Sequence, residues 1–152
     1  MTIFKKIRKT MRVLPFSEKA TEAIRVGAQT AAENFDVFRC EYLLYGIAVM
    51  GHGTGADEPI HLDPKDQEQF LNRIKRQLQS DLPKLVSTEK HRVGQHDLHL
   101  ERVLALAKEF ARRGQAEKVG IKHLMLAMVR ECHNGACQIM LAQGFKIATN
   151  KR

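Results

Sequence analysis

The chain has no tryptophan, and aromatic residues make up only 6% of its 152 residues. Proteins that bind single-stranded nucleic acid by stacking need several exposed rings, so this composition argues against a stacking platform. No apolar run approaches the ~20 residues that a membrane-spanning helix requires, and we expect no membrane span. The three cysteines, Cys40, Cys132 and Cys137, imply no disulfide ladder; without a secretory signal we expect a reducing, cytoplasmic location.

The charge of the chain is basic, with 25 Lys and Arg against 17 Asp and Glu and a net charge of +8. A basic balance favours acidic partners and contributes to non-specific attraction to nucleic acid. Because base-reading motifs are missing, we interpret the charge as a solvated surface. A small basic nucleic-acid-binding protein stays the alternative; a contiguous Lys/Arg stripe would favour it, whereas scattered charge would not.

Motifs for catalysis and cofactor binding are missing as well. The glycines of Gly51–Gly55 are followed by no Lys-Ser/Thr pair, so they form no P-loop, and no nucleophile motif or paired carboxylates stand out. The C-H-x-x-x-C run from Cys132 differs from paired zinc knuckles, and we expect Cys137 in the core. We therefore predict no enzyme, no cofactor and no metal; a metal-dependent enzyme built on His52, His61 and the Cys132 region is a third alternative.

The most regular helical pattern lies in the second half of the chain. Apolar residues at helical spacing predict a helix that ends at Gly114, followed by a buried helix through residues 123–129. The first of these helices has its apolar face at Leu100, Val103, Leu104, Ala107 and Ala111. A turn at Asn134-Gly135 then precedes a short helix closed by Gly144. Within the buried helix, we expect His123 to be a core imidazole that donates to a backbone carbonyl.

These residues carry a resemblance to a known family. Residues 119–126 read V-G-I-K-H-L-M-L, and Arg130-Glu131, Gly135-Ala136 and residues 141–144 follow in order. The run resembles the Clp amino-terminal domain, which precedes the ATPase rings of Clp-type AAA+ unfoldases and consists of two repeats. An earlier copy is present: Phe16–Ala20 is similar to the family's F-T-E-R-A, and Glu41–Leu44 matches E-H-L-L with Tyr42 in place of His123.

The resemblance implies an all-α fold in which two pseudo-repeats of short helices pack into one globular domain. We predict a basic leader at 1–13, which folds loosely onto the domain, and a Clp N-like domain at 14–152. Within it, repeat one covers 14–83, a linker covers 84–96, and repeat two covers 97–145. We expect the final helix of the family to be short or missing in this sequence. When the two repeats are superposed, Tyr42 and His123 should occupy equivalent buried places, and Glu41 should coincide with Lys122.

The first repeat departs from the family after its second helix. Small residues on its first helix should allow close helix packing, and residues 42–50 should form a buried second helix. Residues 51–62 then predict a mobile loop with at most one helical turn and no bound phosphate. Asp63-Pro64 suits the start of a helix that ends before Pro83. The expected core face of that helix consists of Phe70, Leu71, Ile74 and Leu78.

The resemblance also implies a ligand site. In some members, a helix-opening Thr and the Glu of G-T-E-H bind phosphorylated arginine: hydroxyl and helix N–H groups hold the phosphate, and the carboxylate holds the guanidinium. Repeat one carries Ser17 and Glu41 at these places, whereas repeat two carries Asp97 and Lys122, whose charges oppose the ligand. Any phosphoarginine should therefore bind once, at repeat one, unless Arg39 neutralises Glu41. Ser17 and Asp97 also suit plain N-capping.

We accordingly predict a protein-binding module that recruits substrates or adaptors to a Clp-type AAA+ chaperone or protease. The expected partners are protein substrates or adaptors. Walker motifs are absent, so the chain itself should not hydrolyse ATP.

Overall fold

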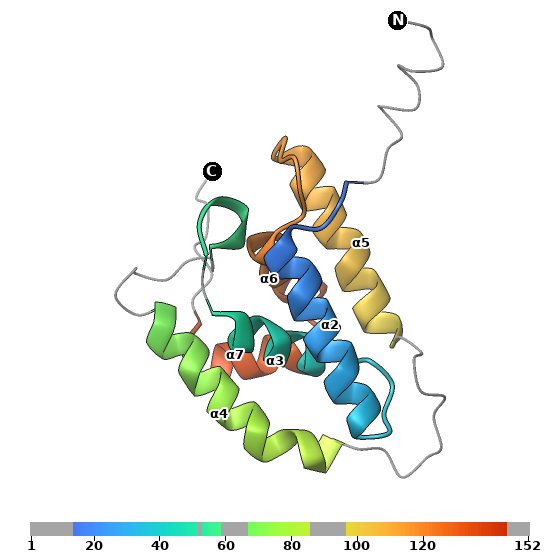
Figure 1. The fold of residues 1–152 in the computed structure, drawn as a ribbon, viewed down its shortest axis with the longest axis vertical. Helices are drawn as coiled ribbons and strands as arrows, with labels where there is room; N and C mark the ends of the chain where they lie inside the picture. The colour runs from blue at the N-terminus through green and yellow to red at the C-terminus, as the bar shows by residue number, and fades with distance from the viewer. Residues whose placement is uncertain (1–13, 52, 59–66, 86–96, 146–152) are drawn as a thin grey trace, which may run out of the picture.

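A computed structural model describes residues 14–51, 53–58, 67–85 and 97–145 of the chain (Figure 1). Across these ranges the fold is all-α, as predicted, and the described residues contain no sheet, only an isolated bridge between Phe16 and Val119. The elements are α2 (Glu18–Glu33), α3 (Cys40–Met50), the short 3₁₀ helix η1 (Gly55–Asp57), α4 (Gln67–Leu85), α5 (Leu98–Arg113), α6 (Ile121–Glu131) and α7 (Gly135–Ala142).

The two repeats have matching helices. α2 and α5 each contain 16 residues, and α3 and α6 each contain 11. Tyr42 and His123 take the third position of α3 and α6, and both are buried, as the sequence predicts. Glu41 and Lys122 share the second position. In Figure 1, α2 and α5 run in opposite directions, so the helix pairs of the two repeats point opposite ways.

Small residues bring α2 and α3 close together. A Cβ atom added at Gly27 would lie 2.8 Å from the carbonyl oxygen of Tyr42, and one at Gly46 would overlap the carbonyl oxygen of Ala23. Both pairs place an early part of one helix against a late part of the other, so α2 and α3 are antiparallel. The expected close approach is confirmed, and each glycine is required by backbone contact rather than by flexibility.

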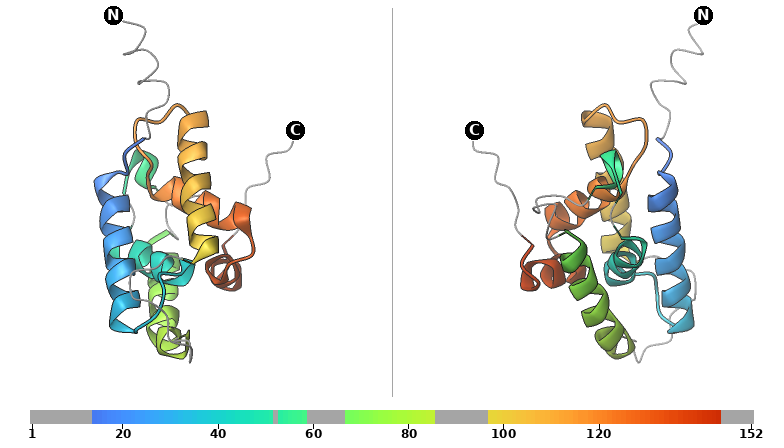
Figure 2. Two further views of the ribbon diagram at one scale, coloured as in Figure 1. Left: turned by 90° about the vertical axis from the view of Figure 1, so that its right-hand side faces the viewer. Right: turned by 60° about the vertical axis from the view of Figure 1, so that its left-hand side comes forward.

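The third helix of repeat one, α4, covers the face of α3 away from α2 (Figure 2). Its apolar face is buried as predicted, at Phe70, Leu71, Ile74 and Leu78. The Phe70 ring lies 5.8 Å from the ring of Phe145, measured between centroids, which ties α4 to the end of repeat two. The predicted end before Pro83 is wrong, because α4 continues to Leu85. A proline in the last turn removes only one backbone donor from the helix.

The loop after α3 contains the one short turn that the sequence allows, η1. Several expectations lie outside the described residues: the helix start at Asp63-Pro64, the leader at 1–13, most of the linker at 84–96 and the chain after residue 145. The predicted mobility of residues 51–62 stays a prediction. In repeat two, α5 ends at Gly114 as predicted, and the α5 residues Leu100, Val103, Ala107 and Ala111 are buried.

Candidate functional site

The first turns of four helices meet at two ends of the domain, and each end joins both repeats. At the first, called the Ser17 end, the Ser17 N–H donates to the Val119 carbonyl at 2.9 Å, which joins the start of α2 to the start of α6. At the second, called the Asp97 end, the Asp97 N–H donates to the Phe38 carbonyl at 2.9 Å, which joins α5 to α3. Each end therefore combines helix starts from different repeats.

The structure does not bring Ser17 and Glu41 together. α2 and α3 are antiparallel, and Tyr42, the neighbour of Glu41, packs against Gly27. Ser17 precedes Gly27 by ten residues of sequence, or about 15 Å along a helix. The two residues that the resemblance assigns to one ligand thus lie at opposite ends of their helix pair.

Asp97 and Lys122 are separated in the same way. His99, two residues after Asp97, bonds Glu131 at the far end of α6. Lys122 precedes Glu131 by nine residues of sequence, or about 13 Å of helix. Lys122 therefore shares the Ser17 end, and Glu41 shares the Asp97 end. The site residues named from the sequence are paired between the repeats and not within them.

At the Ser17 end, the carboxylate of Asp57 takes the place at the helix starts where an anionic ligand would bind. The Ser17 hydroxyl accepts from the Ala20 N–H at 3.0 Å, which confirms the predicted N-cap. The same hydroxyl donates to Oδ1 of Asp57 at 2.6 Å, and that oxygen also accepts the first N–H of α6, from Ile121, at 3.1 Å. A hydroxyl and a helix N–H are the donor types that the resemblance assigns to a phosphate. Here the Asp57 carboxylate occupies both.

His123 also serves the start of α6, but not as predicted. Its Nδ1 accepts a hydrogen bond from the Gly120 N–H at 3.0 Å and does not donate to a carbonyl. The first N–H groups of a helix have no acceptor within the helix, so a ring at the third position can satisfy one of them. Burial lowers the pKa of His123, and the nearby Lys122 lowers it further, which favours the neutral ring that can accept.

At the Asp97 end, Asp97 stands at the N-cap position of α5, but its side chain bonds no helix N–H. The expected capping is therefore wrong for Asp97.

Arg39, at the same end, does not neutralise Glu41 by a direct bond; its guanidinium donates to both oxygens of Asp36, at 3.0 and 3.1 Å. The Tyr42 hydroxyl donates to the same carboxylate at 2.9 Å. Burial alone would raise the pKa of Asp36, but these donors outweigh it and hold the pKa low.

Glu41 is the carboxylate of this end that lines a cavity. Burial raises the pKa of Glu41; its own backbone N–H and the nearby Arg39 act to lower it, and the carboxylates of Asp97 and Asp36 act to raise it. A Cβ atom at Gly135 would lie 2.7 Å from the Glu41 carboxyl carbon, so glycine makes room for this side chain. Glu41 lines a cavity of about 420 Å³ between α4 and α7. The other lining residues are Gln77, Asp81, Gly135, Gln138, Ile139 and Ala142. Carboxylates and amides in such a cavity suit a cationic group.

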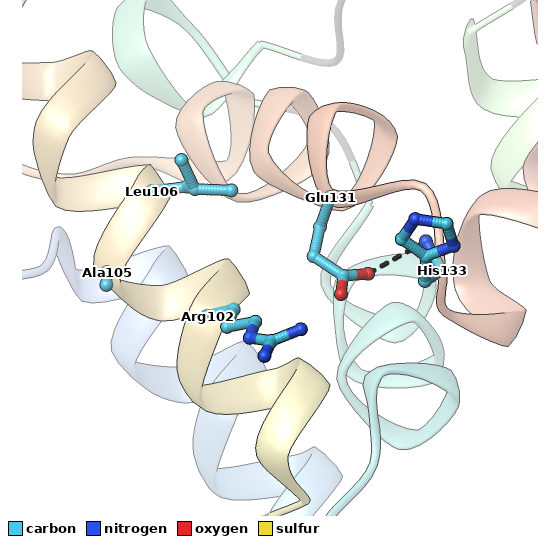
Figure 3. Close-up of a pocket in the computed structure, with 5 residues that line it drawn as sticks. All are labelled: Arg102, Ala105, Leu106, Glu131 and His133. Atoms are coloured by element: carbon cyan, nitrogen blue, oxygen red, sulfur yellow. Dashed lines mark hydrogen bonds between the residues drawn. The ribbon is translucent and has the colours of Figure 1, made fainter.

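A second buried carboxylate, missed by the sequence reasoning, closes α6. Both oxygens of Glu131 are satisfied: Oε2 by Nδ1 of His99 at 2.6 Å, and Oε1 by the His133 N–H and the Asn134 amide, each at 2.9 Å. Figure 3 shows the bond between Glu131 and His133. Burial would raise the pKa of Glu131, but these hydrogen bonds lower it. Glu131 belongs to the family's sequence pattern, but the pattern assigns no role to its side chain. Its partner His99 lies 32 positions away in sequence, so spacing could not reveal the contact.

The cysteines support no metal centre in the part of the chain that the structure describes. Cys40 and Cys137 are buried, and Cys132 is exposed; all three are free thiols. The core position predicted for Cys137 is confirmed. Across the described ranges, no group of His, Cys, Asp and Glu side chains is placed to hold a metal ion. His52 and His61 lie outside those ranges.

The comparison with protein families agrees with this architecture. The family model of the Clp repeat (R) N-terminal domain matches residues 15–143, which is most of the chain. The family is a non-catalytic domain in the context of chaperones and proteolysis. A search of curated proteins finds no match. In the described residues, no helix has the length and apolar character needed to cross a bilayer. The chain belongs to the Clp N-terminal repeat domain family.

Proposed function

We propose that the chain is a protein-binding module that recruits substrates or adaptors to a Clp-type AAA+ unfoldase. The observation that carries the proposal is the match to a non-catalytic Clp domain over the same residues that form the two joined repeats. Among the described residues, two cavities lie beside helix ends, one lined by Glu41 and one lined by Arg102 and Glu131, and both are open to a partner. We propose a cytoplasmic location for this activity, since the odd number of cysteines implies no disulfide framework and fits a reducing compartment.

An affinity pull-down from lysate of the source cell, treated with nuclease, tests the proposal. The chain serves as bait, and an unrelated protein of equal net charge serves as the control. We expect subunits of an AAA+ ring, or adaptors and substrates of one, to be enriched over the control. Enrichment that disappears with nuclease and moderate salt would contradict the proposal and favour nucleic-acid binding, because phosphate contacts are strongly salt-dependent.

The geometry changes the expectation for phosphoarginine. The Ser17 end offers a hydroxyl and Lys122 to a phosphate, but Asp57 already holds the hydroxyl, and Lys122 opposes a guanidinium. The Asp97 end offers Glu41 to a guanidinium, but the Asp97 carboxylate opposes a phosphate. Neither end suits both halves of the ligand. We therefore propose that Glu41 accepts an unmodified arginine side chain of a partner, in place of the single phosphoarginine expected from the sequence.

Calorimetry with argininamide and with phosphoarginine tests this assignment. We expect argininamide to bind more tightly, and Glu41→Gln to abolish the difference, because the amide has no charge to attract a guanidinium. Lys122→Gln is the matched control and should leave argininamide binding unchanged. Tighter binding of phosphoarginine, or binding that survives Glu41→Gln, would contradict it.

A further inference from the structure

A second cavity, unlike the Glu41 cavity, lies between α5 and the end of α6. It has a volume of about 460 Å³, within the range of ligand sites, and is lined by Arg102, Ala105, Leu106, Glu131 and His133. Ala105 and Leu106 form an apolar wall on α5. Figure 3 shows Arg102 extending from α5 toward the part of α6 that carries Glu131. The cavity therefore combines an apolar surface with charged groups at its edge.

The charge that remains available at this cavity is positive. Both oxygens of Glu131 are already bonded, to His99, His133 and Asn134, and its side chain is only 4% exposed. Arg102 is exposed and has no hydrogen bond or ion pair within the described residues. A guanidinium presents paired donors that match the two oxygens of a carboxylate. A ligand that enters here would meet the Arg102 donors first.

Repeat one does not repeat this arrangement. Arg102, the fifth residue of α5, corresponds to Glu22, the fifth residue of α2, so the charge is reversed. Glu22 is ion-paired with Arg25 on its own helix. The position of Glu131 at the end of α6 corresponds to Met50 at the end of α3. At these corresponding positions, which the structure describes in both repeats, only repeat two has an unpaired cation beside an apolar wall.

We infer that the cavity at Arg102 docks a partner peptide in which a carboxylate side chain stands beside an aliphatic side chain. The inference rests on the proposed function, since it names the surface and the chemistry of one partner. The aliphatic side chain packs on Ala105 and Leu106, while the carboxylate binds the Arg102 guanidinium. The net charge of +8 adds a general attraction for acidic segments.

Titration of the full chain with two short peptides, followed by amide NMR shifts, tests the inference. The probes are acetyl-Leu-Glu-Leu-amide and acetyl-Leu-Gln-Leu-amide. We expect the Glu peptide to bind about tenfold more tightly, since a charge-assisted bond is roughly twice as strong as a neutral one. The shifts should centre on Arg102, Leu106 and His133. Arg102→Gln should remove the preference.

Arg112→Gln is the matched control, because it removes the same charge from the same helix about 15 Å away. It should leave both affinities unchanged. Equal affinities in the wild-type chain, no effect of Arg102→Gln, shifts centred elsewhere, or no binding of either peptide would overturn the inference. None of these results would change the expected enrichment of an AAA+ ring in the pull-down. The docking of an acidic peptide at Arg102 can therefore be refuted without refuting the proposed function.

Discussion

The two repeats use the same positions for close helix packing but need different residues there. Gly27 and Gly46 in repeat one correspond to Ala107 and Ala127 in repeat two, at the tenth position of the first helix and the seventh of the second. Both alanines are fully buried, so repeat two accommodates a methyl group where repeat one has backbone contact. The same helix arrangement therefore requires glycine at these positions in repeat one and accepts alanine in repeat two, which indicates closer packing of α2 on α3.

The repeats also differ in how the second helix is closed. In repeat one, the Lys19 ammonium donates to the Met50 carbonyl at 3.3 Å; in repeat two, His99, which has the same position as Lys19, bonds the buried carboxylate of Glu131. The contact recurs with different chemistry, and in repeat two the Glu131 carboxylate also accepts hydrogen bonds from the His133 N–H and the Asn134 amide. At this place repeat two therefore has a buried, ionisable side chain where repeat one has a backbone carbonyl.

Gly46→Ala gives the largest expected effect. The added methyl group would overlap the Ala23 carbonyl, so we expect a loss of about 3 kcal/mol in the free energy of unfolding. The reverse change in repeat two, Ala127→Gly, should cost only about 1 kcal/mol, from helix propensity. Urea unfolding of both variants measures the difference. Equal losses would show that the helix pairs pack at the same distance.

Glu131→Gln tests the buried carboxylate that closes α6 in repeat two. We expect a loss of about 2 kcal/mol at neutral pH, because the ionised oxygens accept three hydrogen bonds. Since the pKa of Glu131 is lowered in the fold, its contribution is present above about pH 4.3 and is lost as the pH falls through the lowered value. Urea unfolding at pH 7 and at pH 3 should show the difference shrinking. A difference that is independent of pH would contradict this role of the charge.

Ser17→Ala compares the two helix caps. We expect a loss of about 1 kcal/mol, because Ser17 caps α2 and also bonds Asp57. Asp97→Ala should cost less than about 0.5 kcal/mol, since the Asp97 side chain caps nothing. Thermal unfolding of the two variants ranks them. A larger loss for Asp97→Ala would mean that its carboxylate has a structural role that the geometry does not show.

The smallest effect concerns a position that is strained in both repeats. Phe35 has φ of 53°, its counterpart Gln115 has φ of 56°, and both follow the end of a first helix. Phe35 is also 76% exposed, so its ring adds little burial. Phe35→Gly should stabilise the chain by about 0.5 kcal/mol, as should Gln115→Gly. Calorimetric unfolding checks both. A loss on Phe35→Gly would show that the aromatic ring makes a stabilising contact.

Most of the fold could be predicted from the sequence, because each helix pattern is local. The apolar face of α4 follows from helical spacing alone, whereas the equivalence of Tyr42 and His123 follows from the repeat pattern of the family that the chain resembles. The end of α4 was misplaced because the single lost donor at Pro83 was weighed as a helix stop. A proline rule considers only the lost hydrogen bond at one turn. It does not include the stabilisation that the preceding turns of the helix supply.

The candidate site was harder to predict, because its groups meet across the repeats. The family resemblance implied that Ser17 acts with Glu41, but in a pair of antiparallel helices the cap of the first helix and the start of the second lie at opposite ends. Asp57 could not be found from sequence, since it comes from a short turn that meets α2 and α6 only in the fold. Likewise, nothing in the sequence tells which ring nitrogen of His123 accepts the Gly120 N–H.

The most direct test of the central claim is the pull-down with the whole chain as bait, quantified by mass spectrometry after nuclease treatment. The account predicts that subunits of an AAA+ ring, or proteins delivered to one, are enriched over a control protein of equal charge. It also predicts that this enrichment resists moderate salt. The claim would be contradicted if only nucleic acid and nucleic-acid-binding proteins were enriched.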